Sequence, residues 1–241
     1  MQWIVTDGIE LEVGDDGFFF SSEPNIDGER IDLSPIGRSI TVVIPDEPVR
    51  AIKAREAVLS LDMSAQEPVA AALEVAGWFR SHRFCSRCGD RARRHLQELA
   101  MLCDHCGHRN YPRLSPCVIV IVTKDDQVLL ANHKRGKTPV YSVLAGFIEV
   151  GESAETAVIR EVKEEAGIWV DDVSYVGSQS WPFPGQFMLA YHAKWKEGEL
   201  KPDRSELADL QWFDKSALPI IPPPGTISRL MIERWLDGKL S

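Results

Sequence analysis

The C-terminal half of the chain alternates between short apolar runs and turns, a pattern that predicts a sheet. A continuous apolar run covers residues 117–123 and is typical of a strand buried on both faces. Asp125 and Asp126 then indicate a turn. We expect the other strands of this region at residues 128–131, 140–144, 173–176, 187–194 and 210–213.

An amphipathic helix is predicted over residues 154–166, which contain neither Pro nor Gly. Ser153 precedes it as a candidate N-cap, and Gly167 follows where helices commonly end in a left-handed residue. A proline-rich turn and a terminal amphipathic helix close the chain. Strands flanked by helices predict an α/β sandwich for residues 113–241.

The first part of the chain has shorter β-type runs, separated by Asp, Gly and Pro turns. We expect strands at residues 3–6, 11–13, 17–21 and 40–44. Helical spacing of apolar residues then predicts a helix at 67–83 that leads into a cysteine cluster. The expected domains are therefore a β-rich domain at 1–66 and a helix with a cysteine module at 67–112. A scaffold role is favoured for the first, with a dimerisation surface or a degenerate copy of the C-terminal domain as alternatives.

Composition narrows the class of protein. The 241 residues are 44% hydrophobic and 26% charged, values typical of a globular chain. No apolar run reaches membrane-spanning length, and the start lacks a secretory pattern, so we expect a cytoplasmic protein. A net charge of −9 argues against broad nonspecific nucleic-acid binding. It permits a phosphorylated substrate, because bound metals can supply local positive charge.

Four of the five cysteines form two C-x-x-C pairs, at Cys85 and Cys88 and at Cys103 and Cys106, separated by fourteen residues. This spacing predicts a structural zinc site with four thiolates, and it fits a disulfide framework less well. Several arginines surround the first pair: Arg80, Arg83, Arg87, Arg91, Arg93 and Arg94. They indicate either a phosphate or RNA contact or, slightly favoured, a solvated surface. Cys117 lies in an apolar run and is expected to be a buried, unreactive thiol.

Three carboxylates share one face of the predicted helix at 154–166. Glu161, Glu164 and Glu165 are spaced i, i+3, i+4 and would repel one another at neutral pH. A bound Mg²⁺ or Mn²⁺ would remove that repulsion, since both prefer oxygen ligands. Arg160 is placed to orient one of the carboxylates. The alternative for these glutamates taken alone is a solvated, Glu-rich helix.

The full frame from Gly146 through Glu152 and Arg160 to Gly167 resembles the Nudix box. Residues 178–184 read Ser-Gln-Ser-Trp-Pro-Phe-Pro, which is similar to the Ser-Gln-Pro-Trp-Pro-Phe-Pro signature of the NADH pyrophosphatases. Members of that family also carry a four-cysteine zinc ribbon before the Nudix domain. The resemblance covers the chain from about residue 70 to residue 235.

The resemblance implies cleavage of the NAD(H) pyrophosphate to nicotinamide mononucleotide and AMP, removal of NAD caps from RNA, and a homodimer. It implies that Mg²⁺ or Mn²⁺ binds Glu161, Glu164, Glu165 and Glu206, with Arg160 beside them. The substrate-binding residues that it implies are Ala145, Phe147, Tyr111, Gln179, Phe183 and Trp181, the last supplied across the dimer. From the residues alone, Glu206 is a polar loop residue, and Phe147 and Tyr111 are core aromatics.

Several alternatives stay open on sequence alone. The general base is Glu165, Glu164 or Glu206. Ser180 and Gln186 differ from the residues usual in the family signature, so ADP-ribose or another nucleoside diphosphate derivative is a second substrate class. A noncatalytic nucleotide or RNA sensor is a third reading, and the complete glutamate set argues against it.

Overall fold

The computed structural model describes residues 2–14, 17–49, 51–134 and 139–240. The chain forms two compact units. The first comprises Met1–Leu114 with Pro182–Gly185, and the second comprises Ser115–Trp181 with Gln186–Ser241.

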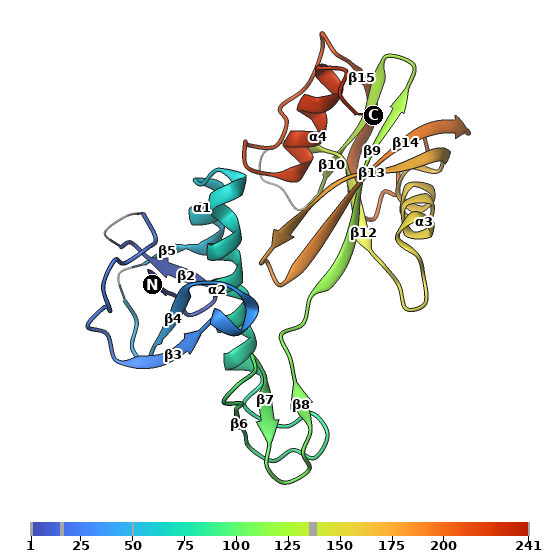
Figure 1. Cartoon of the computed structure of the whole chain (residues 1–241). Coiled ribbons are helices and arrows are strands. Elements are labelled where there is room, and N and C mark those ends of the chain that lie inside the picture. The colour runs from blue at the N-terminus through green and yellow to red at the C-terminus, as the bar shows by residue number, and fades with distance from the viewer. Residues whose placement is uncertain (1, 15–16, 50, 135–138, 241) are drawn as a thin grey trace. The chain divides into compact units, whose positions relative to one another are not determined.

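The first unit contains a small sheet, a long helix and a ribbon (Figure 1). Its three-stranded sheet has the order β1 (Gln2–Val5), β4 (Ile40–Pro45) and β3 (Gly28–Asp32), with β1 parallel and β3 antiparallel to β4. The other elements before the ribbon are β2 (Glu10–Glu12), η1 (Ser34–Ile36), β5 (Ala51–Lys53), α1 (Ala54–Leu59) and α2 (Met63–Ser81). The ribbon itself consists of β6 (Ala92–Arg94), β7 (Met101–Cys103) and β8 (Arg109–Asn110).

Two sequence expectations for this unit need correction. No strand forms over the described part of 17–21, where Phe20 makes an isolated bridge with Trp3 instead. The long helix begins at Met63 rather than at residue 67 and contains Pro68. The prediction rested on the helical spacing of apolar residues from Val69 onward, and the structure begins the helix one turn earlier.

The second unit is built on a seven-stranded sheet of order β11-β10-β9-β14-β13, with β12 also paired to β9 and β15 to β10. The strands are β9 (Ser115–Lys124), β10 (Gln127–His133), β11 (Tyr141–Ser142), β12 (Leu144–Phe147), β13 (Trp169–Trp181), β14 (Gln186–Glu197) and β15 (Leu207–Asp214). β14 runs parallel to β9, and the other pairings are antiparallel. The strand expected at 140–144 is therefore two strands, and β12 continues to Phe147.

Helices cover both faces of this sheet, with α3 (Ala154–Ala166) on one side and α4 (Ile227–Leu236) on the other (Figure 1). The central strand β9 shows why. Val118, Val120 and Val122 pack in the α3 cluster, whereas Ile119 and Ile121 between them pack in the α4 cluster. Alternation along a strand places successive side chains on opposite faces. The predicted α/β sandwich is confirmed, with the cysteine ribbon preceding it.

None of the helices in the described ranges is long and apolar enough to span a bilayer.

Candidate active site

Local signals set the position of α3. The Ser153 hydroxyl accepts a hydrogen bond from the Thr156 amide at 3.2 Å, and Gly167 ends the helix with φ 76°. Val158 and Val162 are fully buried against the sheet. This packing fixes the rotation of the helix, so that its carboxylate face lies beside β12.

Arg160 connects α3 to the loop that precedes it. Its guanidinium donates to both carboxylate oxygens of Glu152 at 2.9 Å and to the Phe147 carbonyl at 2.8 Å. The same group donates to Glu161 at 2.7 Å and to Glu164 at 3.1 Å. A bidentate Arg–carboxylate pair is strong and directional. Arg160 therefore holds Glu161 in one orientation, as predicted from its position.

Glu161 lies directly over Gly146 of β12. A Cβ atom on Gly146 would come within 2.0 Å of the Glu161 carboxyl carbon. The carboxylate is 9% exposed, and burial raises its pKa while Arg160 opposes that shift. The glycine is required because the acidic side chain occupies the space that any larger residue would need.

Glu165 is the most perturbed carboxyl group of the site. It is 5% exposed, and its Oε2 atom has no hydrogen-bond partner among the described residues. Burial, followed by the nearby charges of Glu161 and Glu206, raises the pKa of Glu165 to about 8. Leaving a buried carboxylate oxygen unpaired is costly, so this atom marks a place for a cation.

These carboxylates line one cavity of about 560 Å³ within the second unit. Its wall includes Glu161, Glu164, Glu165 and Glu206, together with Arg160, Ala145 and Phe147. Glu206 arrives from a tight turn before β15, in which its amide donates to the Asp203 carbonyl at 3.2 Å. Lys134 supports the same turn, because its amide donates to the Glu206 carbonyl at 3.0 Å and its ammonium group donates to the Arg204 carbonyl.

The donor set fits a hard divalent cation. Four carboxylates face the cavity, one with an unpaired buried oxygen, and Mg²⁺ commonly takes a few carboxylates together with phosphate oxygens and waters. In the described part of the chain, the potential ligand atoms that converge within 4.8 Å are those of the ribbon, and the glutamates are spaced more widely. Arg160 lies between Glu161 and Glu164 and accounts for part of this spacing.

The predicted substrate residues fall into three groups. Ala145 and Phe147 line the cavity, and Phe147 is 50% exposed. Trp181 is the last residue of β13. Its cross-strand partner Gln186 lines the cavity. Tyr111 and Phe183 belong to the first unit.

Gln179 is placed differently from a substrate contact. Its side chain is buried, its amide nitrogen donates to the Gly225 carbonyl at 2.8 Å, and its oxygen accepts from the Ile227 amide at 2.8 Å. Both ends of the side-chain amide thus bind the backbone at the start of α4.

Sequence reasoning singled out Gln186 only as a departure from the family signature. It did not place His133, Lys134, Met188 or Cys117 at the cavity, although the structure shows all of these residues in its lining. They come from the ends of β10, β14 and β9, and the sheet register brings Met188 beside Cys117. No local motif marks such residues, because long-range strand pairing brings them to the site. Cys117 is buried as predicted, and burial raises the pKa of its thiol to about 11.

The ribbon brings its four cysteines together. The Sγ atoms of Cys85 and Cys106 are 3.6 Å apart, those of Cys88 and Cys103 are 3.5 Å apart, and all four lie within 4.8 Å of one another. Sulfurs about 2.3 Å from a tetrahedral zinc ion would be separated by about 3.8 Å. Gly89 and Gly107 adopt φ values of 83° and 69° directly after the pairs, which allows each knuckle to turn. The cluster fits the predicted structural zinc ion.

Comparison with known proteins agrees with both halves of this description. Residues 113–235 match the NUDIX domain family, and residues 80–111 match the NADH pyrophosphatase zinc ribbon domain. The chain is 45% identical over 176 residues to the NAD-capped RNA hydrolase NudC of Escherichia coli O1:K1, covering 73% of this chain and 68% of that protein. It is 48% identical over 161 residues to the protein of the same name from Klebsiella pneumoniae, covering 67% of this chain and 63% of that protein.

Among solved structures, the crystal structure of a Nudix hydrolase from Nitrosomonas europaea superposes with a TM-score of 0.56 at 22% identity. The match covers 65% of this chain and 92% of the other, and it supports the fold. The sequence resemblance is confirmed by the two domain matches and by the curated relatives. The chain therefore belongs to the Nudix family of hydrolases, in the group that carries an NADH pyrophosphatase zinc ribbon before its Nudix domain.

Proposed function

We propose that this protein hydrolyses the pyrophosphate bond of NAD(H), giving nicotinamide mononucleotide and AMP, and removes NAD caps from RNA 5′ ends. The observation that carries the proposal is the unpaired, buried Glu165 carboxylate in a cavity shared with Glu161, Glu164 and Glu206. The NudC relatives, named as NAD-capped RNA hydrolases, support the choice of substrate.

In the proposed reaction, water attacks one pyrophosphate phosphorus and the bond from that phosphorus to the bridging oxygen breaks. Glu161, Glu164, Glu165 and Glu206 would hold a divalent cation, which would supply charge neutralisation at the phosphate oxygens and acidify water. Glu165 or Glu164 accepts the proton that the water loses, with Glu206 as the alternative base. Arg160 keeps Glu161 fixed as a ligand throughout, because its guanidinium is anchored on Glu152.

The cation at the glutamates is proposed to be Mg²⁺ or Mn²⁺, because carboxylate ligands suit both. Zinc belongs to the four cysteines. We further propose a homodimer in which the partner supplies Trp181, on the basis of the family resemblance. A cytoplasmic location belongs to the same proposal, because a four-thiolate metal site suits a compartment that keeps thiols reduced.

We propose that the three regions predicted from the sequence have separate roles. Residues 113–241 would carry catalysis, and residues 67–112 would carry the zinc module. Residues 1–66 would serve as a scaffold. The clustered carboxylates support the first assignment, and the cysteine tetrad supports the second.

ADP-ribose is a second candidate substrate, and one observation favours it. Gln186 departs from the residue usual in the family signature and lines the catalytic cavity. Its cross-strand partner is Trp181, beside the second departure at Ser180. By the family resemblance, these changes fall in the segment that selects the substrate.

The test is product analysis by chromatography after incubation with NADH, NAD⁺, ADP-ribose or NAD-capped RNA, each with Mg²⁺ or Mn²⁺. We expect nicotinamide mononucleotide and AMP from the dinucleotides and a 5′-monophosphate end from the capped RNA. Cleavage of ADP-ribose alone would reassign the substrate, and no cleavage of any compound would favour a noncatalytic sensor.

The matched variant for this test is Glu165→Gln, which keeps the size of the side chain but cannot ionise. Loss of one essential electrostatic group typically costs about 100- to 1000-fold in turnover. We expect a loss of that order with an unchanged circular dichroism spectrum. Near-normal turnover in the variant would remove Glu165 from the metal site.

A further inference from the structure

The zinc ribbon concentrates positive charge in an acidic protein. Residues 80–112 contain seven arginines and three acidic residues, whereas the whole chain has a net charge of −9. This segregation means that the ribbon presents a different field from the rest of the chain. A local basic surface on an acidic protein attracts a polyanion to one place rather than everywhere.

The three acidic residues of the ribbon are already engaged. Asp90 contacts His105 at 2.9 Å, Asp104 contacts Arg93 at 2.6 Å, and Glu98 contacts Arg109 at 2.9 Å. Two further arginines are also used within the first unit. Arg80 pairs with Asp7 at 3.2 Å, and Arg94 donates to the Arg30 carbonyl.

Three arginines then remain, namely Arg83, Arg87 and Arg91. Each is exposed, and none has a carboxylate partner among the residues that the structure describes. Arg83 is held in place by stacking, because its guanidinium carbon lies 5.2 Å from the centre of the Phe79 ring. The ribbon thus carries three uncompensated cations within a short stretch of chain.

An exposed aromatic ring lies among them. Phe84 is 62% exposed, and it forms an isolated antiparallel bridge with Arg91. Directly opposed residues of an antiparallel pair project from the same face, so the ring and the Arg91 side chain are neighbours. Phe84 also adjoins Cys85 in the chain, so the zinc site fixes the backbone beside the ring.

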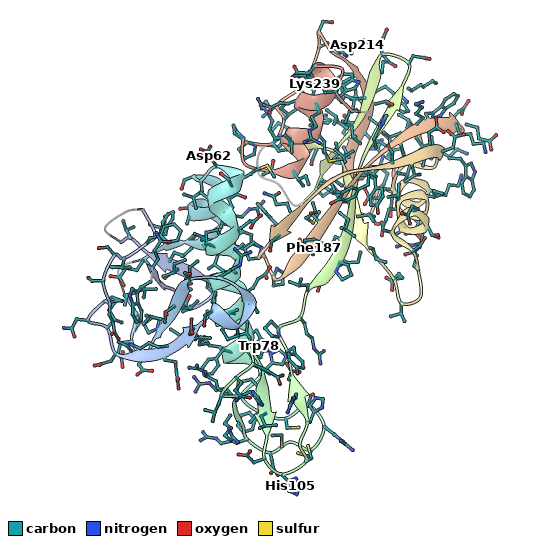
Figure 2. The ribbon with its side chains drawn as sticks, viewed as in Figure 1. Asp62, Trp78, His105, Phe187, Asp214 and Lys239 are labelled. Atoms are coloured by element: carbon teal, nitrogen blue, oxygen red, sulfur yellow. The ribbon has the colours of Figure 1, made fainter. Side chains whose placement is uncertain are left out.

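Figure 2 shows His105 at the far end of this ribbon from Trp78, the α2 residue whose indole nitrogen donates to Asn110 at 2.9 Å. Both ends of the ribbon are therefore fixed, one by the cysteine tetrad and the other by this hydrogen bond. A rigid framework lowers the entropy that a flexible basic segment would lose on binding.

A surface that combines arginines with an exposed aromatic ring is complementary to single-stranded nucleic acid. Phosphates supply the negative charge, and unpaired bases supply flat faces that stack on aromatic and guanidinium groups. A duplex keeps its bases stacked inside and cannot use the ring in this way. An acidic peptide would use the arginines but would leave the ring without a specific role.

We infer that Phe84, Arg83, Arg87 and Arg91 form a surface, here named the ribbon patch, that binds the single-stranded RNA chain behind an NAD cap. This inference rests on the proposed decapping function for its biological setting. The ribbon patch accounts for how a chain of net charge −9 holds a polyanionic substrate. It predicts that RNA binding and dinucleotide hydrolysis are separable.

The first experiment measures binding of a fluorescent single-stranded RNA with a 5′-monophosphate, by anisotropy at several salt concentrations. The variants are Arg83→Gln/Arg87→Gln/Arg91→Gln and, separately, Phe84→Leu. Each phosphate contact with single-stranded RNA adds about 0.7 to the salt slope, so the triple variant should lose about 2. Phe84→Leu should weaken binding about fivefold or more without changing the slope.

The control is Lys53→Gln/Lys196→Gln/Lys201→Gln, which removes the same charge at exposed positions outside the ribbon. It should leave the affinity and the salt slope close to those of the wild type. An equal loss in this control, or equal affinity of the wild type for duplex RNA, would overturn the ribbon patch. Zinc content and thermal melting are measured on every variant. If the triple variant loses zinc, Phe84→Leu alone decides the question.

The second experiment compares release of nicotinamide mononucleotide from NAD⁺ and from NAD-capped RNA. Ribbon patch variants should keep their rate on NAD⁺ and lose kcat/KM on capped RNA by at least the loss in RNA affinity. Equal rates on both substrates would overturn the inference. If the wild type hydrolyses neither substrate, the proposed function fails, and the binding experiment still decides whether the surface holds RNA.

Discussion

Gly146 shows how a single missing side chain shapes the site. The Glu161 carboxylate occupies the space next to the Cα atom of Gly146, and the hydrogen bond from Arg160 keeps that carboxylate in place. A buried acid is thus held between a glycine on a strand and an arginine on its own helix. Both residues therefore set the position of Glu161.

We predict that Gly146→Ala reduces stability by roughly 1–3 kcal/mol, as overpacking of a filled site does. Turnover should fall as well, because Glu161 must leave its position. Denaturant unfolding and kcat measure the two effects. Gly177→Ala is the matched control, since an added Cβ there meets no atom within 4 Å. A similar loss in both variants would show that the Glu161 contact is not the cause.

Glu165 gives a prediction about pH in the metal-free protein. Burial raises its folded pKa to about 8, whereas the unfolded carboxyl titrates near about 4.3. The folded state therefore binds the proton more tightly. The resulting stabilisation is full below about pH 4.3 and is lost as the pH rises through about 8.

Relative to the wild type, Glu165→Gln should gain stability as the pH rises from about 4.3 to about 8, on the order of a few kcal/mol at most. Chemical unfolding of both proteins in a metal chelator across this range measures the difference. Added Mg²⁺ should stabilise the wild type more at the higher pH, because the ligand must be ionised. The exposed Glu197→Gln is the control, and parallel profiles for all three proteins would contradict the prediction.

At the scale of elements, Gln179 joins β13 to the start of α4. The family resemblance implied a substrate contact, but the structure commits both ends of its amide to the backbone of Gly225 and Ile227. It supplements the Thr226 side chain, which accepts from the Arg229 amide at 3.2 Å. The start of α4 is therefore fixed by hydrogen bonds to Gln179 of β13.

We predict that Gln179→Leu destabilises the protein by roughly 1–3 kcal/mol, because it removes the hydrogen bonds of the side-chain amide to the buried Ile227 amide and to the Gly225 carbonyl. The melting temperature should fall, and KM should stay close to the wild-type value. Gln179→Glu provides a comparison, since it retains an acceptor for the Ile227 amide and loses the donor to the Gly225 carbonyl. A large rise in KM at unchanged stability would instead favour a direct substrate contact.

Sequence predicted α3 within its observed bounds because its signals are local, with Ser153 before the helix and Gly167 after it. The cysteine tetrad was predictable for the same reason. The sequence did not predict β3, β5 or α1, because short elements that contain charged residues show no clear hydrophobic period. The same limit applies to the site. Its glutamate helix could be recognised locally, whereas the arrival of Gln186 and Met188 depends on strand register.

At the scale of the whole molecule, the chain places two metal sites of different chemistry in two units. The thiolates hold the ribbon of the first unit, and the carboxylates line a cavity in the second. Softer sulfur ligands select zinc, and hard oxygen ligands suit Mg²⁺ or Mn²⁺. The two sites are therefore expected to respond independently to metal removal.

We predict that a zinc chelator in excess Mg²⁺ unfolds the ribbon and leaves the sheet of the second unit folded. Loss of the tetrad removes the organising centre of a small domain that has little core of its own. Hydrogen exchange should rise at residues 85–106 and remain low in β9. Cys103→Ser should reproduce the effect without chelator. Simultaneous loss of protection in both regions would contradict this independence.

The contacts of Arg160 stay within one segment of the chain. Its partners Phe147, Glu152, Glu161 and Glu164 all lie between Gly146 and Gly167, and the Lys163 ammonium donates to the Gly167 carbonyl at 3.0 Å. These hydrogen bonds all form within the segment, whereas other residues of the cavity lining come from strands outside it. The segment is therefore a local structural unit. Grafted between relatives, the segment would bring Arg160, Glu161, Glu164 and Glu165 with it. The host protein would supply Glu206 and the residues that select the substrate.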